Sequence, residues 1–204
     1  MVTGNVFYDF LTSDDNLNYI VELSNELDHF RKEMHILFWE KYNTLMSQKL
    51  AESEYCFTWK FTPFNLKHRL TDWERSSLTT ADSDSTKIKL LFYFLQESPE
   101  VNFRLNYCVR WNKKSSEVKY DSPKIAILKS KLYKYKINIP SDWEYLYGFS
   151  QWQIYDALFL RRMYKETEVF VQEIVDHNWN MFLDIRPEIE EINSEINYLF
   201  TTPT

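Results

Sequence analysis

Apolar residues in the first quarter of the chain recur at intervals of three and four positions, which is the period of an amphipathic helix. No proline or glycine interrupts this stretch, so the pattern predicts one helix over residues 17–52. A helix of that length indicates either a spine for the domain or a seam with a second copy, and a homodimer through residues 17–52 is one expectation. The apolar positions are Ile20, Leu23, Leu27, Phe30, Met34, Leu37, Phe38, Leu45, Met46 and Leu50.

Alternating and continuous apolar runs then predict strands. Residues 55–61 place an aromatic side chain at every odd position, which is the period of a half-buried strand. Residues 88–95 are almost all apolar and predict a central strand, and residues 103–111 predict its antiparallel partner in a hairpin. Between the strands, residues 64–86 predict a polar loop with a short helix around Leu66–Arg75.

The last third of the chain predicts mostly helix. Pro123 at a first helical position opens an amphipathic helix, and residues 145–149 predict a short strand. A further helix is expected from about residue 151 to 181, and Pro187 is expected to open a final acidic helix. We find no internal repeat or linker. Residues 1–204 therefore predict one α+β domain, with a central antiparallel sheet, a long N-terminal helix and C-terminal helices packed on it.

Composition excludes several kinds of chemistry. The only two glycines, Gly4 and Gly148, are too few and too far apart for a phosphate-binding loop or for a nucleophile elbow. The four histidines are scattered and show no metal-ligand spacing. Cys56 and Cys108 fall inside predicted strands, which favours two buried free thiols over a disulfide. We therefore expect no cofactor, no metal site and no catalytic residue.

One triplet keeps an enzymatic alternative open. Glu117-Val118-Lys119 has the E-x-K pattern in which a carboxylate holds a divalent metal and a lysine positions water. A polar turn surrounds it, whereas a nuclease carries the triplet on an apolar strand. A solvated charged loop is therefore the favoured interpretation, and a divalent-metal nuclease is the lesser one.

Charge is distributed unevenly along the chain. The net charge is −6, yet residues 104–136 hold ten basic and two acidic residues, which gives 10 − 2 = +8 and leaves −14 for the rest. Interleaved basic and aromatic residues are typical of surfaces that follow a phosphate backbone and stack on bases. The acidic C-terminal region could instead dock against this segment, within one chain or between two. The candidate contact residues are Arg104, Arg110, Lys113, Lys114, Lys124, Lys129, Lys131 and Lys134 for charge, with Trp111 and Tyr120 for stacking.

Neither a signal segment nor an apolar run long enough to cross a bilayer is present in the sequence, so we expect a cytoplasmic protein without a membrane partner.

The run from Phe30 to Tyr42, with Phe38-Trp39-Glu40 near its centre, resembles a helix in a family of uncharacterised accessory domains. These domains follow PD-(D/E)XK nuclease cores in bacterial restriction-like and defence proteins. The hairpin through Trp111, the pair Asp142-Trp143 and the region of Trp179 follow in the family's order. The nuclease core is missing, so no catalytic residue is carried over. The resemblance implies a recognition module near nucleic acid, in a bacterium or a mobile element.

Two functions remain open on these grounds. The favoured one is a non-catalytic module that binds nucleic acid through residues 104–136, in a bacterial or mobile-element defence context. The alternative is an acidic interaction or inhibitor protein, such as a phage-type antagonist of a host nucleic-acid-binding complex. In that case acidic residues near the C-terminus would imitate the charge of nucleic acid; they are Glu188, Glu190, Glu191 and Glu195, together with Asp14 and Asp15.

Overall fold

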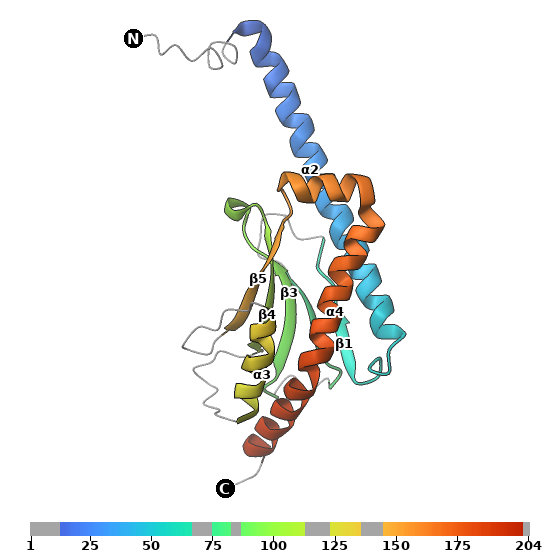
Figure 1. The fold of residues 1–204 in the computed structure, drawn as a ribbon, viewed down its shortest axis with the longest axis vertical. Helices are drawn as coiled ribbons and strands as arrows, with labels where there is room; N and C mark the ends of the chain where they lie inside the picture. Colours follow the sequence, from blue (N-terminus) through green and yellow to red (C-terminus); the bar gives the residue numbers. More distant parts are fainter. Residues whose placement is uncertain (1–12, 67–74, 83–86, 113–122, 136–144, 202–204) are drawn as a thin grey trace, which may run out of the picture.

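The computed structural model describes residues 13–66, 75–82, 87–112, 123–135 and 145–201 (Figure 1). A long N-terminal helix, an antiparallel sheet and C-terminal helices make up these residues, which confirms the predicted α+β class. In chain order the elements are α2 (Asp14–Ala51), β1 (Trp59–Thr62), β2 (Arg75–Thr80), β3 (Leu90–Gln96), the short helix η1 (Pro99–Val101), β4 (Arg104–Trp111), α3 (Pro123–Lys134), β5 (Tyr145–Gln153) and α4 (Ala157–Thr201).

The five strands form one antiparallel sheet in the order β1-β2-β3-β4-β5, so each strand pairs with the one before it in the chain. Phe92 on β3 stands between Leu78 on β2 and Val109 on β4, and these three side chains share the face that carries the main core. Leu91 and Tyr93 point to the opposite face and form a second, smaller cluster with Cys108. The central strand is therefore buried on both faces, as its continuous apolar run predicts.

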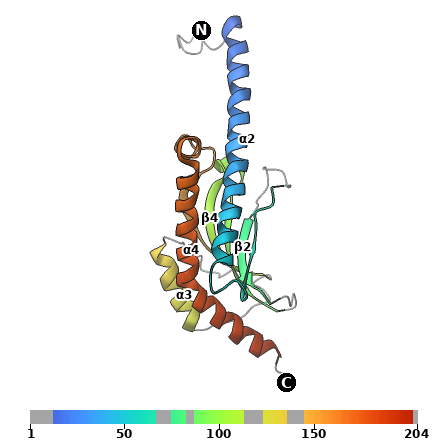
Figure 2. The same cartoon turned by 90° about the vertical axis from the view of Figure 1, so that its right-hand side faces the viewer.

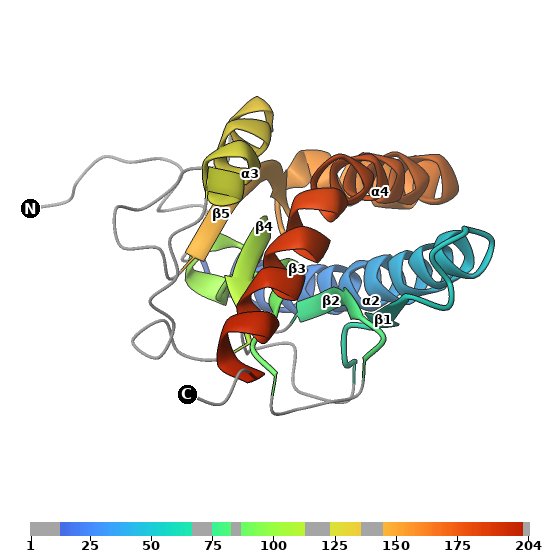
Figure 3. The same ribbon diagram turned by 90° about the horizontal axis from the view of Figure 1, so that it is seen from below.

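Helices α2 and α4 pack side by side and run parallel (Figures 1 and 2). Lys41 of α2 pairs with Glu168 of α4, and Lys49 pairs with Asp176 at 2.7 Å. Both pairs are 127 residues apart in the chain (168 − 41 and 176 − 49), so the two helices keep one register. Helix α3 packs against α4, and Figure 3 shows α3 and α4 on one side of the strands.

A buried polar cluster fastens α2 to the central strand. The indole Nε1–H of Trp39 donates to Oε1 of Gln96 at 2.8 Å, and Nε2 of His35 lies 2.6 Å from the same oxygen. Because an indole nitrogen only donates, this oxygen is the acceptor and His35 carries its proton on Nε2. The Nδ1 atom of His35 is buried and has no hydrogen-bond partner among the described residues. Burial lowers the pKa of His35 to about 4, and the hydrogen bond that His35 donates to Gln96 opposes that shift.

Two expectations for the first half of the chain are wrong. The strand predicted over residues 55–61 begins only at Trp59, because the chain turns after α2, where the carbonyl of Tyr55 accepts from the amides of Thr58 and Trp59. Cys56 lies in this turn and not inside a strand. Residues 75–80, predicted as loop, form β2, whose sequence RSSLTT has one apolar residue and no apolar alternation. Residues 67–74 of the predicted short helix lie outside the described residues.

The C-terminal half also differs from its pattern. Strand β5 continues to Gln153, so the helix expected from residue 151 begins at Ala157, with the amide of Leu158 bonded to the Asp156 carboxylate at 2.8 Å. Pro187 opens no new helix and lies inside α4. Buried isoleucines on both sides of it keep the helix against the core; they are Ile185, Ile189 and Ile192. The irregular residue of α4 is Glu166, with φ −143° and ψ 34°.

Candidate binding surfaces

The structure places the predicted basic residues on two elements. Arg104, Arg110 and Trp111 lie on β4, and the four lysines Lys124, Lys129, Lys131 and Lys134 lie on α3. The other predicted contact residues lie outside the described residues; they are Lys113, Lys114 and Tyr120. The Glu117-Val118-Lys119 triplet also lies outside them. The indole of Trp111 is only 3% exposed and belongs to the main core.

Carboxylates of α4 lie against the lysines of α3. Lys131 pairs with Glu188 at 2.7 Å, and its ammonium also donates to the backbone carbonyl of Asp184 at 2.6 Å. Lys124 pairs with Glu191 and, at 3.2 Å, with Glu195. Hydrogen bonding to Glu191 is the main cause of the raised pKa of Lys124.

The charge of α3 is balanced by the segment of α4 that lies beside it. Helix α3 has four lysines and no acidic residue, hence +4, whereas residues 184–195 of α4 have one arginine and five acidic residues, hence 1 − 5 = −4. On β4, Arg104 pairs with Glu97 at 2.7 Å. Lys134 is the most exposed of the paired lysines, at 66%, and lies 3.9 Å from Asp184. The sequence left open whether the acidic C-terminal region docks on the basic segment within one chain. These ion pairs between α3 and α4 form such a contact within the chain.

The N-terminal part of α2 has the opposite character. Residues 14–29, called here the projecting segment, extend beyond the sheet and α4 (Figures 1 and 2). Leu23 is 70% exposed and Leu27 is 41% exposed. Phe30 follows this stripe, and its ring lies 5.9 Å from that of Tyr164 on α4. The apolar series that packs on the body therefore continues along the projecting segment, where Leu23 and Leu27 are exposed.

The projecting segment is also acidic. It contains five Asp and Glu residues and no Lys or Arg, hence 0 − 5 = −5. Ile20, Leu23 and Leu27 share one face of the helix at three- and four-residue spacing, while Glu22 and Glu26 lie along one flank and Asp28 along the other. An apolar stripe between two acidic flanks suits a partner surface that is apolar at its centre and basic at its rim.

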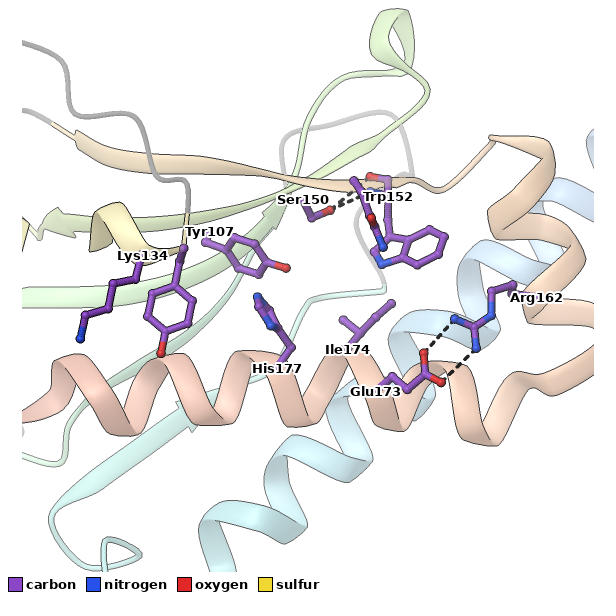
Figure 4. Close-up of a pocket in the computed structure, with 10 residues that line it drawn as sticks. Tyr107, Lys134, Ser150, Trp152, Arg162, Glu173, Ile174 and His177 are labelled. Carbon is purple, nitrogen blue, oxygen red and sulfur yellow. Dashed lines mark hydrogen bonds and ion pairs between the residues drawn. The ribbon is translucent and has the colours of Figure 1, made fainter. Parts of the chain in front are cut away.

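A groove of about 640 Å³ lies where β4, α3, β5 and α4 meet (Figure 4). Tyr107 and Ile174 are its buried lining residues, and Tyr135 and Trp152 contribute further rings. His177 of α4 is partly exposed, and its ring lies 5.5 Å from that of Tyr107. Burial lowers the pKa of His177 and raises that of Tyr107, so both side chains are neutral at pH 7.

An ion-paired arginine closes one end of the groove. Arg162 meets Glu173 through two nitrogen–oxygen contacts of 2.8 and 3.1 Å, and it also bonds Glu166 at 3.0 Å. Hydrogen bonds to Glu173 and then Glu166 raise the pKa of Arg162, and Arg162 in turn lowers that of Glu173. The guanidinium also lies over the ring of Phe170, 4.6 Å from its centroid. The charge of Arg162 is therefore balanced inside the protein.

Sequence reasoning did not find this groove. Its residues come from four separate elements, and only the tertiary fold brings Tyr107 beside His177. No spacing along the chain indicates such a site, because each element contributes only a few of its residues. The exposed stripe of α2 did have a signal, since Ile20, Leu23 and Leu27 belong to the apolar series that predicts the helix.

The described residues show no grouping of three or more His, Cys, Asp or Glu side chains that could hold a metal ion. Cys56 and Cys108 are free thiols, and burial raises the pKa of Cys108 to about 12. Reactive thiols have a lowered pKa, so Cys108 is not suited to nucleophilic chemistry. In the part of the chain that the structure describes, no helix combines the length and apolar character that crossing a membrane requires.

Comparison with known proteins identifies no relative: no family model, no curated protein and no solved structure matches this chain.

Proposed function

We propose that this chain is a non-catalytic binding protein that recognises another protein through the projecting segment of α2. The observation that carries this proposal is the exposure of Leu23 and Leu27, apolar side chains that lie between acidic flanks on a helix extending beyond the fold. Amphipathic helices commonly bind by laying such a stripe into an apolar groove of their partner.

The negative charge of the projecting segment limits which proteins can bind it. Each copy carries −5 on its projecting segment, so two copies would bring like charges together along the whole stripe. A basic protein, such as one that itself binds nucleic acid, offers the complementary rim. This is the interaction or antagonist function, with the acidic surface placed on residues 14–29. A bacterial or mobile-element context would supply partners of that kind.

The test is a pull-down with the immobilised full chain and two matched variants. The variant Leu23→Ser with Leu27→Ser removes two apolar anchors from the projecting segment. The control Leu158→Ser with Val169→Ser removes two equally exposed apolar side chains from α4. We expect a basic protein to be retained by wild type and by the control, and to be lost by the α2 variant.

Direct binding to the purified partner then decides the proposal. Loss of central apolar anchors should weaken affinity by at least about 30-fold, since such anchors contribute about 2 kcal/mol or more. Affinity should also fall with added salt because the rim is electrostatic. Equal retention by both variants would contradict the proposal. So would a homodimer in light scattering that the variant Leu23→Ser dissociates, because that result would assign the stripe to a second copy.

Binding of nucleic acid through residues 104–136 stays a prediction. The carboxylates of α4 compete with phosphate for Lys124, Lys131 and Lys134, so the intramolecular pairs weigh against it. The measurement is fluorescence anisotropy with labelled DNA and RNA across a salt series. Replacing Lys129, Lys131 and Lys134 by Glu is compared with replacing three exposed lysines elsewhere, namely Lys32, Lys60 and Lys165, by Glu. Steep salt-dependent binding that only the first triple variant abolishes would establish the α3 surface instead.

A further inference from the structure

The groove between β5, α3 and α4 is a second surface, independent of the projecting segment. Its volume of about 640 Å³ lies within the range of about 300–1,000 Å³ usual for sites that bind small ligands. None of its lining residues belongs to residues 14–29, so ligand binding in the groove can be tested separately from the proposed protein interface.

Flat rings dominate the lining. Tyr107, Tyr135, Trp152 and His177 come from four elements, with His177 5.5 Å from Tyr107 and 6.0 Å from Tyr135 between ring centroids. The rings are tilted against one another, by 52° between Tyr107 and His177 and by 78° between Tyr135 and His177, so a planar ligand can stack on one ring face at a time. A branched aliphatic ligand would leave these faces poorly covered.

One buried hydroxyl of the groove has no hydrogen-bond partner among the described residues. Tyr107 is only 6% exposed, and its hydroxyl makes no hydrogen bond within the described residues. In Figure 4 this hydroxyl points toward the space between Trp152 and His177. Buried hydroxyls almost always have a hydrogen-bond partner, so this one is placed to receive one from a ligand. A neutral tyrosine and a neutral histidine can each donate or accept, which matches a ring edge with both kinds of group.

The charges of the groove favour a largely neutral ring over a simple anion. Arg162 is balanced by Glu173 and Glu166, which leaves Lys134 as the more exposed cation, beside Asp184 at the mouth. A single exposed ammonium at the rim can meet a phosphate attached to the ring by a sugar.

We propose that the groove binds a nucleobase, with Tyr107 bonding its edge, one aromatic side chain stacking on its face and Lys134 meeting the attached phosphate. Two sources share this chemistry: a free nucleotide, and an unstacked base in single-stranded nucleic acid. The proposal does not depend on the interface formed by α2.

The experiment is calorimetric titration of the full chain with the common nucleosides, their 5′-monophosphates and single-stranded tetranucleotides of the same bases. The variant Tyr107→Phe keeps the ring and removes the hydroxyl, and it should fold normally because that hydroxyl makes no hydrogen bond to another described residue. We expect it to weaken binding about 3- to 10-fold, the effect of one neutral hydrogen bond. Tyr164→Phe, which removes an exposed hydroxyl outside the groove, is the matched control.

A second variant distinguishes the contribution of the base to binding from that of the phosphate. Lys134→Gln should weaken the monophosphates by about 3-fold and leave the nucleosides unchanged. Tetranucleotides that bind more tightly than the matching monophosphate would identify a strand as the source, and equal or weaker binding would identify the free nucleotide. The proposal is overturned if none of these probes binds at millimolar concentration, or if Tyr107→Phe and Tyr164→Phe bind alike.

Discussion

The two halves of α2 belong to one unbroken helix but have opposite surroundings. In the half that packs on the sheet, Trp39 is fully buried and its indole bonds Gln96. In the projecting segment, Leu23 is 70% exposed. An isolated helix of about 16 residues is marginal in water, so the projecting segment depends on its continuity with the buried half. The fold thus supports a helical surface that it does not itself cover.

Helix α3 adds a third case to this comparison. Like the projecting segment it is amphipathic and carries charge of one sign, but its lysines meet carboxylates of α4. Unbalanced charge in a sequence therefore does not by itself identify a binding surface. What distinguishes the two helices is that α4 supplies carboxylates to the lysines of α3, whereas among the described residues the Lys or Arg ion pair of the projecting segment is Asp28–Arg31, within α2 itself.

The largest expected loss of stability follows from replacing Trp39. Replacing it by Ala removes a fully buried ring, its stacking on Phe64 at 4.0 Å and its bond to Gln96. We expect the free energy of unfolding to fall by about 3–5 kcal/mol, measured by urea denaturation. Leu23→Ala in the other half should change it by less than about 0.5 kcal/mol. Comparable losses at both positions would mean that the projecting segment is covered after all.

The next effect is a pH dependence that arises in the buried half. His35 has a pKa of about 4 in the folded protein and an ordinary value of 6.5 when unfolded. Between these values the unfolded chain binds more protons, so lowering the pH favours unfolding. From pH 7 to pH 5 this one group should reduce the free energy of unfolding by about 2 kcal/mol.

The variant His35→Gln isolates that contribution. Its unfolding free energy should change less between pH 7 and pH 5 than that of the wild type, by about 2 kcal/mol. The control is His29→Gln, because His29 is exposed in the projecting segment, outside the buried polar cluster. Identical pH profiles for wild type and His35→Gln would show that His35 does not remain neutral in the fold.

A smaller change in the free energy of unfolding is expected from a substitution where α3 packs against α4. Lys131→Glu places a negative charge against Glu188 and Asp184 and should lower the free energy of unfolding by about 1 kcal/mol. Adding Glu188→Lys restores an opposite-charge pair and should recover part of the loss, as a double-mutant cycle would measure. If Lys131→Glu leaves stability unchanged, the lysines of α3 are available to an external partner.

The smallest change in the free energy of unfolding is expected when a charge is reversed in the projecting segment. Glu26→Lys should alter the free energy of unfolding by less than about 0.5 kcal/mol, because no basic residue of residues 14–29 faces it. Binding of the protein partner should nevertheless weaken, and more so at low salt. A stability loss equal to that of Lys131→Glu would remove the distinction between the two helices.

Much of the fold was predictable from the sequence because strong patterns follow burial. The long N-terminal helix, the central strand β3 and its partner β4 all have apolar spacings set by the core they face. Strand β2 was not predictable, since five of its six residues are polar and its pairing partners decide its conformation. Pro187 was misleading because burial of Ile185 and Ile189 outweighs the hydrogen bond that proline removes.

The candidate sites were predictable only where one element forms them. The stripe of α2 is local, and the sequence already indicates an interface along residues 17–52. The excess of basic residues over 104–136 is a property of the sequence, but the sequence leaves open whether α4 neutralises the lysines of α3. The groove beside Tyr107 forms only when four elements pack together. No spacing of residues along the chain indicates that arrangement.

The parallel packing of α2 and α4 also determines how the molecule responds to tension. The N-terminal end of α2 and the C-terminal end of α4 lie at opposite ends of the fold (Figure 1). A force that pulls these ends apart slides one helix along the other and loads the contacts between them together; these include Lys41–Glu168, Lys49–Asp176 and Tyr42–Asn178. Single-molecule pulling should therefore record one cooperative rupture, whereas a series of small steps would show that the two helices separate from one end.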